Sequence, residues 1–315
     1  MYNKITKLID SNEIYCISGG CSYTLECNFK NEVQTHDIGS PSAGMGYIKD
    51  SVIYHISYLL KNNIPPKNII AFINITQIGR ISIKYPDYIW DSIKDYHDIL
   101  YERNYLGNKF KYYKNGLCSF DNQVYGFMNQ TDNQLNKYPK FVREWCLNQI
   151  KANETLDVST HIKNYIEDIV LLQTFLKLNN IEYYFYFMNN TFEGWYYDID
   201  AILKHRYSSH TKYELPNLKS YLNISEIDNN IKSIYDLLDF EKMLLHTNDK
   251  QTFGGLDEYC NDNYPKESFK DYKTNTKSEC TIGLHPNNGV CDAFTKKYLY
   301  PKWINFYNNI KNEEV

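Results

Sequence analysis

Alanine, arginine and long apolar runs are scarce in this sequence. Only 5 of its 315 residues are Ala and 4 are Arg, against 36 Asn, 31 Tyr and 30 Lys. The longest apolar stretches, such as Ile69–Ile73 and Ile169–Leu172, are far shorter than the roughly 20 residues that cross a bilayer. Residues Met1–Asn12 contain two lysines and an aspartate but no apolar core, unlike a secretory signal. We therefore expect a soluble protein with no membrane partner.

Motifs for metal binding and redox chemistry are missing as well. None of the 8 cysteines forms a Cys-x-x-Cys pair, and none of the 8 histidines forms a His-x-x-x-His pair. Those spacings mark zinc sites and thiol redox sites. The cysteines are therefore predicted to be free thiols, and neither a metal nor another cofactor is predicted.

The charge balance excludes a further class of function. The net charge is −4, from 34 basic and 38 acidic residues, which argues against an extended phosphate-binding surface and hence against a nucleic-acid partner. Hydrophobic residues make up 43% and charged residues 23% of the chain, values that are typical of a globular protein. The excess of Asn, Tyr and Lys is what an AT-rich genome produces.

Apolar patterns predict an α/β protein built on a parallel sheet. Three short runs have the composition of buried strands: Glu13–Ser18, Ile69–Thr76 and Ile181–Met188. Helical spacing of apolar residues predicts helices over Tyr47–Leu60, Ser159–Asn179 and Asn287–Tyr300, the last of them ending at Pro301. Because helices connect these strands, we expect the strands to be parallel neighbours with the first two helices covering the sheet.

Two long stretches do not fit a minimal sheet of this kind. They lie at about 84–153 and 190–279, and the second contains a predicted helical segment, Ile227–His246. No Pro/Ser-rich linker and no repeat separates them from the rest. We therefore interpret residues 1–315 as a single α/β domain with two insertions.

Candidate chemistry lies where predicted strands end, since ligands of open α/β sheets bind beyond the carboxyl ends of the strands. Gly19–Thr24 follows the first strand and places Ser22 on a glycine-led turn. It lacks the Lys-Ser/Thr and Gly-x-Gly-x-x-Gly patterns of nucleotide-binding loops. A serine on such a turn can act as a nucleophile, although a plain strand-ending turn has the same composition.

A histidine near the C-terminus favours the interpretation of Ser22 as a nucleophile. His285-Pro286 stands immediately before the last predicted helix. A histidine held in a short loop there can face a serine at the end of the first strand and act as its general base.

These motifs resemble those of the SGNH (GDSL-like) hydrolases. Gly20-Cys21-Ser22-Tyr23 is similar to their first block, in the Gly-Cys-Ser-aromatic-Thr form common among phage and large-virus members. Ala43–Ile48 resembles the second block, Ile73–Arg80 the third and Leu284–Asn287 the last. The resemblance implies a flavodoxin-like three-layer sandwich with a mostly parallel central sheet and helical insertions.

The resemblance also implies roles for individual residues. Ser22 would be the nucleophile and His285 its base, while the backbone N–H groups of Ser22 and Gly44 would form an oxyanion hole. The Gly-x-Asn-Asp pattern of the third block is absent, and Gln77 stands in that vicinity as a third donor. Arg80, at the exit of the second predicted strand, is a candidate for binding substrate.

The catalytic acid of the family normally precedes the histidine by two or three residues, where this chain has Gly283 and Ile282. Glu279 is the candidate for orienting His285 in its place, with a main-chain carbonyl as the alternative. Trp195 is a candidate aromatic wall of the substrate site. Codon bias and ordinary core packing account for this tryptophan nearly as well.

Two functional hypotheses follow. The first is a serine esterase or O-deacylase of the acetylesterase type that hydrolyses an acyl ester of a glycan or small molecule without a cofactor, and acyl transfer in place of hydrolysis stays open. The second is a degenerate SGNH fold that serves as a glycan-binding or virion-associated structural protein. Both are expected in the cytoplasm, of a host cell in the viral case, or in a virion. The sequence does not indicate an oligomeric state.

Overall fold

The computed structural model describes most of the chain. The described residues are 13–20, 33–40, 43–76, 82–106, 108–113, 117–120, 123–127, 135–154, 158–188, 193–198, 219–223, 229–248, 251–263, 281–282, 285–286 and 288–313.

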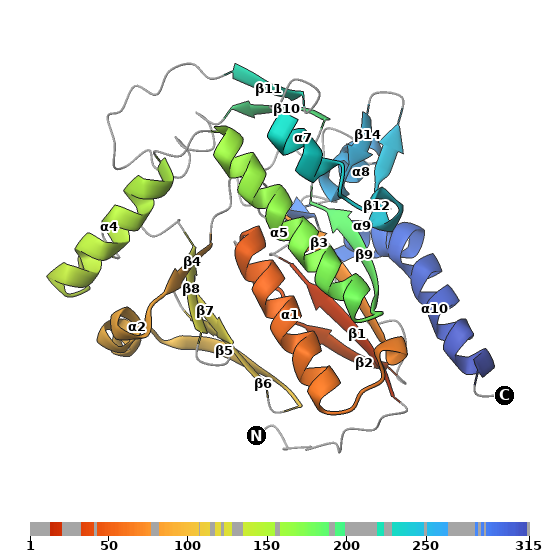
Figure 1. Cartoon of the computed structure of the whole chain (residues 1–315), viewed down its shortest axis with the longest axis horizontal. Coiled ribbons are helices and arrows are strands. Elements are labelled where there is room, and N and C mark those ends of the chain that lie inside the picture. Colours follow the sequence, from red (N-terminus) through yellow and green to blue (C-terminus); the bar gives the residue numbers. More distant parts are fainter. Residues whose placement is uncertain are drawn as a thin grey trace.

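A parallel sheet forms the centre of the molecule (Figure 1). Its five described strands are β1 (Ile14–Gly19), β2 (Val33–Asp37), β3 (Ile69–Ile75), β9 (Glu182–Phe187) and β12 (Met243–Leu244). They pair in the order β12-β9-β3-β1-β2, and every pairing is parallel. The prediction that the three apolar runs are parallel neighbours is confirmed, because β3 pairs with both β1 and β9. The predicted α/β class with a mostly parallel central sheet is confirmed with it.

Burial on both faces explains why β1 and β3 are almost continuously apolar. All six residues of β1 and all seven of β3 are buried. Helices α1 (Met45–Lys61), α5 (Val158–Leu178) and α7 (Asn229–Tyr235) lie together on one face. On β9 the alternating residues Tyr184 and Tyr186 contact the opposite layer, where Lys302 and Phe294 approach their rings.

That opposite layer is the C-terminal helical segment. It comprises α9 (Asn288–Phe294), a π-helical turn (Thr295–Leu299) and α10 (Tyr300–Glu313). The prediction that the helix ends at Pro301 is wrong, since α10 continues past it. Proline lacks an N–H group and its ring disrupts the preceding α-helical turn, and the wider π turn immediately before Pro301 accommodates both effects.

A second, antiparallel sheet lies beside α1. Its strands are β4 (Ser82–Tyr85), β5 (Ile99–Tyr105), β6 (Asn108–Tyr113), β7 (Leu117–Phe120) and β8 (Gln123–Phe127), paired in the order β4-β8-β7-β6-β5. Side chains alternate between its faces. One face joins the main core against α1 through Phe110, Tyr112, Cys118, Phe120 and Tyr125. This sheet lies within the stretch at about 84–153 that was predicted to be an insertion.

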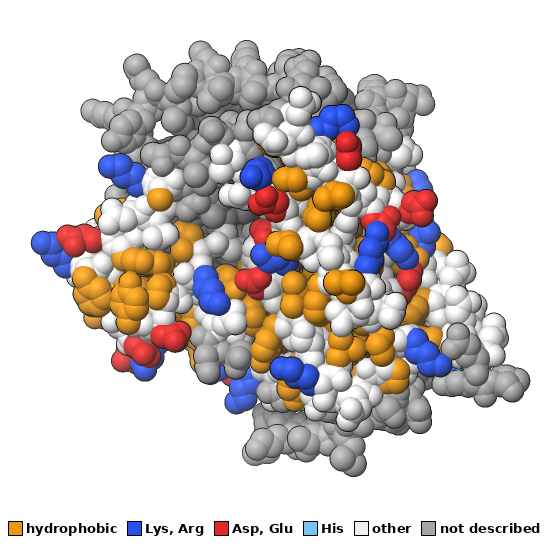
Figure 2. Space-filling view, in the orientation of Figure 1, with side chains coloured by type: hydrophobic (Ala, Val, Ile, Leu, Met, Phe, Trp, Pro, Cys, Tyr) orange, Lys and Arg blue, Asp and Glu red, His pale blue; other side chains and the backbone are white. Residues whose placement is uncertain are grey.

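The other face of the antiparallel sheet packs on α2 (Asp87–Ile93) and α4 (Lys140–Glu154). Tyr113, Leu117 and Val124 contribute to this smaller core. Hydrophobic side chains also gather on the outer surface of these two helices (Figure 2), where Tyr88 is 61% exposed and Phe141 is 50% exposed.

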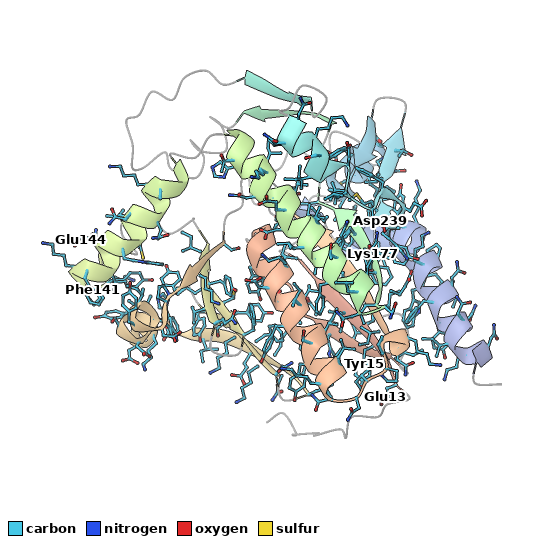
Figure 3. The ribbon with its side chains drawn as sticks, in the orientation of Figure 1. Glu13, Tyr15, Phe141, Glu144, Lys177 and Asp239 are labelled. Carbon is cyan, nitrogen blue, oxygen red and sulfur yellow. The ribbon has the colours of Figure 1, made fainter. Side chains whose placement is uncertain are left out.

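The predicted helix Ile227–His246 is only partly present. α7 ends at Tyr235, and Met243–Leu244 forms strand β12 instead. Gln173 of α5 explains the interruption, because its side chain donates to the carbonyl of Leu237 at 2.5 Å and accepts from the N–H of Asp239 at 3.0 Å. Lys177 pairs with the Asp239 carboxylate at 2.7 Å (Figure 3), so α5 captures the backbone that would extend the helix.

The remaining described elements are short. They are the antiparallel pairs β10 (Glu193–Asp198) with β11 (Lys219–Asn223), β13 (His246–Asn248) with β14 (Gln251–Gly254) and β15 (Thr281–Ile282) with β16 (His285–Pro286), together with α8 (Leu256–Asn263) and single 3-10 turns at Pro66–Asn68, Lys94–Tyr96 and Phe240–Lys242. Of the helices that the structure describes, none is both long and apolar enough to cross a membrane.

Candidate active site at the carboxyl edge of the parallel sheet

The direction of the strand connections reverses between β1 and β3. The chain leaves β1 towards β2 on one side, and it leaves β3 towards β9 on the other. Connections that diverge in this way open the position at which ligands of open α/β sheets bind. The glycine-led turn singled out in the sequence begins here, at the end of β1.

Two glycines are required at this exit for different reasons. A Cβ atom on Gly19 would lie 2.6 Å from Cγ2 of Val52 in α1, so the strand could not approach the helix with a larger residue. Gly20 has a φ of 149°, a backbone conformation that residues with a side chain rarely adopt. Glycine is therefore required at position 19 by the packing of β1 against α1, and at position 20 by the bend that follows the strand.

The predicted site residues differ in how far the structure describes them. Ser22, Gln77, Arg80 and Glu279 lie outside the described residues. His285 in β16 and Trp195 in β10 are described for their backbone only. Gly44 is fully described, at the N-terminus of α1. The expected contact between Ser22 and His285 thus stays a prediction.

The segment that follows β2 is tied to the exit of β1. The N–H of Ile38 donates to the carbonyl of Ser18 at 2.9 Å, and the N–H of Ser40 donates to the carbonyl of Gly20 at 3.0 Å. These bonds extend the β1–β2 pairing beyond the end of β2. The residues leading to Gly44 therefore start directly beside the turn that leads to Ser22.

Gly44 also contacts the chain that follows β3. Its N–H donates to Oγ of Ser82 at 3.0 Å, and Ser82 is the first residue of β4. Three stretches of sequence, from the ends of β1, β2 and β3, thus meet at this edge. Sequence reasoning missed Ser82, because a lone serine outside any motif gives no signal before the chain is folded.

Asp37, at the end of β2, is held by the antiparallel sheet. Arg103 of β5 pairs with the Asp37 carboxylate, and its Nη1 donates to the Asp37 carbonyl at 2.7 Å. The hydroxyl of Tyr105 donates to the same carbonyl at 2.8 Å. Burial opposes the charge on Arg103, but the Asp37 carboxylate outweighs it and raises the pKa of the guanidinium above its ordinary value. This clamp was also not predicted.

Three buried, uncharged side chains next to Asp37 form a hydrogen-bonded chain: Asn108, His55 and His36. Asn108 Nδ2 lies 3.3 Å from His55 Nδ1, and His55 Nε2 lies 2.6 Å from His36 Nδ1. If the Asn108 amide donates to His55, then the N–H on the far side of the His55 ring donates to His36. Burial lowers the pKa of His36 to about 3 and the pKa of His55 well below its ordinary value, so both rings are uncharged at neutral pH.

The carboxyl end of β3 is polar although it is buried. Thr76 is fully buried, and its carbonyl accepts a hydrogen bond of 2.5 Å from the hydroxyl of Tyr165 in α5. Among the described residues, its Oγ1 atom has no hydrogen-bond partner. An unpaired buried hydroxyl is costly, so a polar group bound at this strand end would supply the partner that the hydroxyl lacks there.

A second histidine cluster lies beyond the end of β12. His246 Nε2 donates to the carboxylate of Asp262 in α8 at 2.6 Å, and His246 Nδ1 lies 2.8 Å from the hydroxyl of Tyr298 in the π-helical turn. Helix α8 also packs against β16, the short strand that contains His285. The cluster therefore anchors the part of the chain that presents the predicted base.

Thiol and metal chemistry find no support among the described residues. No group of three or more His, Cys, Asp and Glu side chains is arranged to hold a metal ion there. Burial raises the pKa of Cys118 to about 12 and that of Cys291 to about 11, so neither is an activated thiol. Comparison of the chain with protein-family models, with curated proteins and with solved structures finds no match. The functional argument therefore rests on the geometry at the carboxyl ends of β1, β2 and β3.

Proposed function

We propose that the chain is an ester hydrolase of the SGNH type on a flavodoxin-like fold. The observation that carries the proposal is the strand order. Numbered along the chain, the five parallel strands lie in the order 2-1-3-4-5, which is the order of the flavodoxin-like sheet with its binding crevice between the first and third strands. The glycine turn of the first block and the Gly44 segment of the second block both begin at that crevice.

In the proposed reaction Ser22 attacks the carbonyl carbon of an acyl ester. His285 accepts the serine proton and returns it to the leaving alcohol. Backbone N–H groups at the crevice stabilise the negative charge that develops on the carbonyl oxygen. Water then hydrolyses the acyl-enzyme through the same histidine, and the substrate is an acyl ester of a glycan or small molecule.

Local geometry supports a nucleophile at the end of β1. Gly19 lies close to Val52 of α1 at the end of β1, and the backbone bends at Gly20, which has a positive φ. Such a turn after a strand exposes the serine of hydrolases at the edge of the sheet.

One observation favours the alternative, a degenerate SGNH fold that binds a glycan or serves in a virion without turnover. Ile282 pairs directly with His285 in the β15–β16 hairpin, where the family carries its catalytic acid nearby. An apolar residue there cannot orient the imidazole. Loss of the acid of a triad costs orders of magnitude in rate.

Labelling with a fluorophosphonate probe separates the two functions. An activated Ser22 adds the mass of the probe to a peptide containing Ser22, and Ser22→Ala abolishes the addition while the thermal unfolding midpoint stays unchanged. His285→Ala should reduce the labelling rate by a factor on the order of 10⁴, because the two residues act as a unit. Folded wild-type protein that resists labelling and turns over no acyl ester would favour the binding function.

A further inference from the structure

A polar cavity of about 580 Å³ lies between helix α2 and the antiparallel sheet. In Figure 1, α2 and α1 lie on opposite sides of this sheet. Lys109, Lys111 and Tyr113 of β6 line the cavity on the sheet side, and Trp90 lines it from α2. Its volume is within the range of roughly 300–1,000 Å³ that is usual for ligand-binding pockets. Of the described residues that line it, none belongs to β1, β2 or β3, so the cavity is separate from the site proposed for ester hydrolysis.

Two aromatic side chains give the cavity an apolar wall. The rings of Trp90 and Tyr113 contact each other with centroids 5.1 Å apart and an interplanar angle of 64°. His97, which is buried, stacks on the indole with centroids 6.0 Å apart, so the core holds the tryptophan in place. Tyr113 is only 8% exposed, whereas Trp90 is half-buried. The accessible part of the indole offers a flat apolar surface to a ligand ring.

Two buried hydroxyl groups lie next to this wall. Ser119 of β7 lines the cavity with Tyr113, is 5% exposed, and has its Oγ 3.3 Å from the Tyr113 hydroxyl oxygen. The two hydroxyls carry two protons and their mutual hydrogen bond uses one, while the other has no acceptor among the described residues. Burial raises the pKa of Tyr113, so its phenol keeps its proton at neutral pH. An oxygen atom of a ligand would accept the remaining hydrogen bond.

The sheet side of the cavity carries an excess of positive charge. Lys109 and Lys111 both approach the carboxylate of Glu102, with nitrogen–oxygen distances of 3.8 and 3.9 Å. Two ammonium groups thus share one carboxylate at the outer limit of an ion pair. Among the described residues of this face, one positive charge is therefore left to be neutralised by a ligand.

The helix side of the cavity carries carboxylates instead. Asp91 pairs with Lys94 at 3.1 Å, but both side chains are more than half exposed, and such a surface pair contributes little free energy. Asp87, the first residue of α2, also lines the cavity. Its carboxylate oxygens can accept hydrogen bonds from hydroxyl groups of a ligand. The cavity thus has a cationic side, an acceptor side and an apolar wall.

We propose that this cavity binds a sugar that carries one carboxylate, such as a uronic acid residue of a glycan. The sugar carboxylate pairs with Lys111, whose side chain is 35% exposed against 58% for Lys109. The apolar face of the sugar ring packs on Trp90, and its hydroxyls donate to Asp87. A phosphate ester carries nearly two negative charges at neutral pH, which exceeds the single positive charge available.

Titrations with methyl β-D-glucuronide and methyl β-D-glucoside test the recognition of the carboxylate, because the first sugar has a carboxylate where the second has a hydroxymethyl group. Followed by NMR signals of the sugars, the wild type should bind the glucuronide at least about tenfold more tightly. Lys111→Met should remove this preference and leave glucoside binding unchanged. Lys140→Met is the matched control, since Lys140 pairs with Glu144 on the exposed surface of α4 (Figure 3) and should bind both sugars as the wild type does.

Trp90→Phe tests the aromatic wall. The smaller ring retains aromatic packing against Tyr113 but offers less surface to the sugar, so the affinity for both sugars should fall by about two- to tenfold. Binding of the glucuronide should also change the tryptophan fluorescence of the wild type, and this change should disappear in Trp90→Phe. The urea midpoint of each variant shows whether its fold is retained.

Each other outcome contradicts the proposal. A folded wild-type protein that binds neither sugar overturns it, and equal affinities for the two sugars overturn the recognition of the carboxylate. Equal losses in Lys111→Met and Lys140→Met would show unspecific attraction to charge. Adenosine 5′-monophosphate that binds more tightly than the glucuronide, and depends on Lys111, would identify a nucleotide pocket instead.

The test is independent of the proposed ester hydrolysis, because it measures binding and requires no turnover. Ser22→Ala should bind the glucuronide as the wild type does, even if the wild type hydrolyses no ester. Loss of glucuronide binding in Ser22→Ala, with the fold retained, would place the sugar at the hydrolase site and overturn the assignment to this cavity.

Discussion

Arg103 binds Asp37 through both the side chain and the main chain of the aspartate, and so joins the antiparallel sheet to the edge of the parallel one. The guanidinium pairs with the carboxylate and donates to the carbonyl at 2.7 Å. Asp37 ends β2, and its carboxylate in turn accepts the N–H of Gly39 at 3.0 Å. The first residues of the segment that leads to Gly44 are therefore fixed from outside the sheet.

Replacing Arg103 by Met should cost about 2–3 kcal/mol of unfolding free energy, the range for hydrogen bonds that involve charged groups. Turnover should also fall, because the Gly44 segment loses an anchor. Urea unfolding measures the first effect. Arg143→Met is the control: Arg143 contacts Asn136 on the exposed surface of α4, and its loss should change stability by less than about 0.5 kcal/mol. Equal losses for both variants would show that Asp37 is not clamped.

Because His36 and His55 are buried and uncharged, we expect the free energy of unfolding to fall at acidic pH. Both rings have pKa values lowered by burial, to about 3 for His36, whereas in the unfolded chain a histidine titrates near 6.5. Below about pH 6.5 the unfolded state binds more protons, so stability falls as the pH falls towards the folded pKa. At pH 4.5 the loss from His36 should be about 2.7 kcal/mol, and His55 should add a loss of the same sign.

Unfolding by urea between pH 4.5 and 7.5 tests this dependence. The double variant His36→Phe/His55→Leu removes both titrating rings, so it should show a clearly shallower decline than the wild type, whatever its stability at pH 7.5. Parallel pH curves for the two proteins would contradict the assignment of these rings as neutral and buried.

His246 should be a structural anchor of the C-terminal segment. His246→Leu leaves Asp262 and Tyr298 without their common partner and should lower the unfolding free energy by about 2–4 kcal/mol. Tyr298→Phe removes one hydrogen bond and should cost about 1 kcal/mol. In a double-mutant cycle the two changes should couple by at least about 0.5 kcal/mol. Strict additivity would show that the hydrogen bond between them contributes nothing.

Gly19 and Val52 should also be energetically coupled, through steric fit in place of a hydrogen bond. Gly19→Ala places a methyl group 2.6 Å from Val52 Cγ2 and should destabilise the fold by about 1–3 kcal/mol. Val52→Ala alone creates a cavity and should cost a similar amount. The double variant fills that cavity with the new methyl group, so its loss should be smaller than the sum of the two. A loss equal to or larger than the sum would show that the strand and helix do not meet at this point.

The sequence predicts the buried strands well and the polar ones poorly. Ile69–Ile75 is apolar throughout because helices cover both faces of β3, and this pattern needs no tertiary information to interpret. The segment Val33–Asp37 contains Gln, Thr, His and Asp, yet it forms β2. His36 is buried there only because His55 and Tyr105, distant in sequence, bond to it and stack on it.

The antiparallel sheet was missed for a related reason. Tyrosines point to both of its faces, as Tyr112 and Tyr113 show, so the alternation of polar and apolar residues in β6 covers only Lys109–Tyr112 and then stops. In the candidate site, the glycine turn and the Gly44 segment are recognisable from local motifs. Ser82 and Arg103 acquire their partners only when the two sheets are brought together, and no local pattern contains that information.

The position of the antiparallel sheet in the chain has a consequence for the order of folding. The backbone leaves the central sheet at Ile75 and returns to it at Glu182, so the β3–β9 pairing closes a long loop and is entropically slow. Strands β5 to β8 form successive hairpins, and β8 also pairs with β4, so every pairing of this sheet lies within residues 82–127. During synthesis these hairpins can assemble against α1 and the β2 side long before β9 emerges, whereas the edge of β3 stays open to pairing with other chains until β9 covers it.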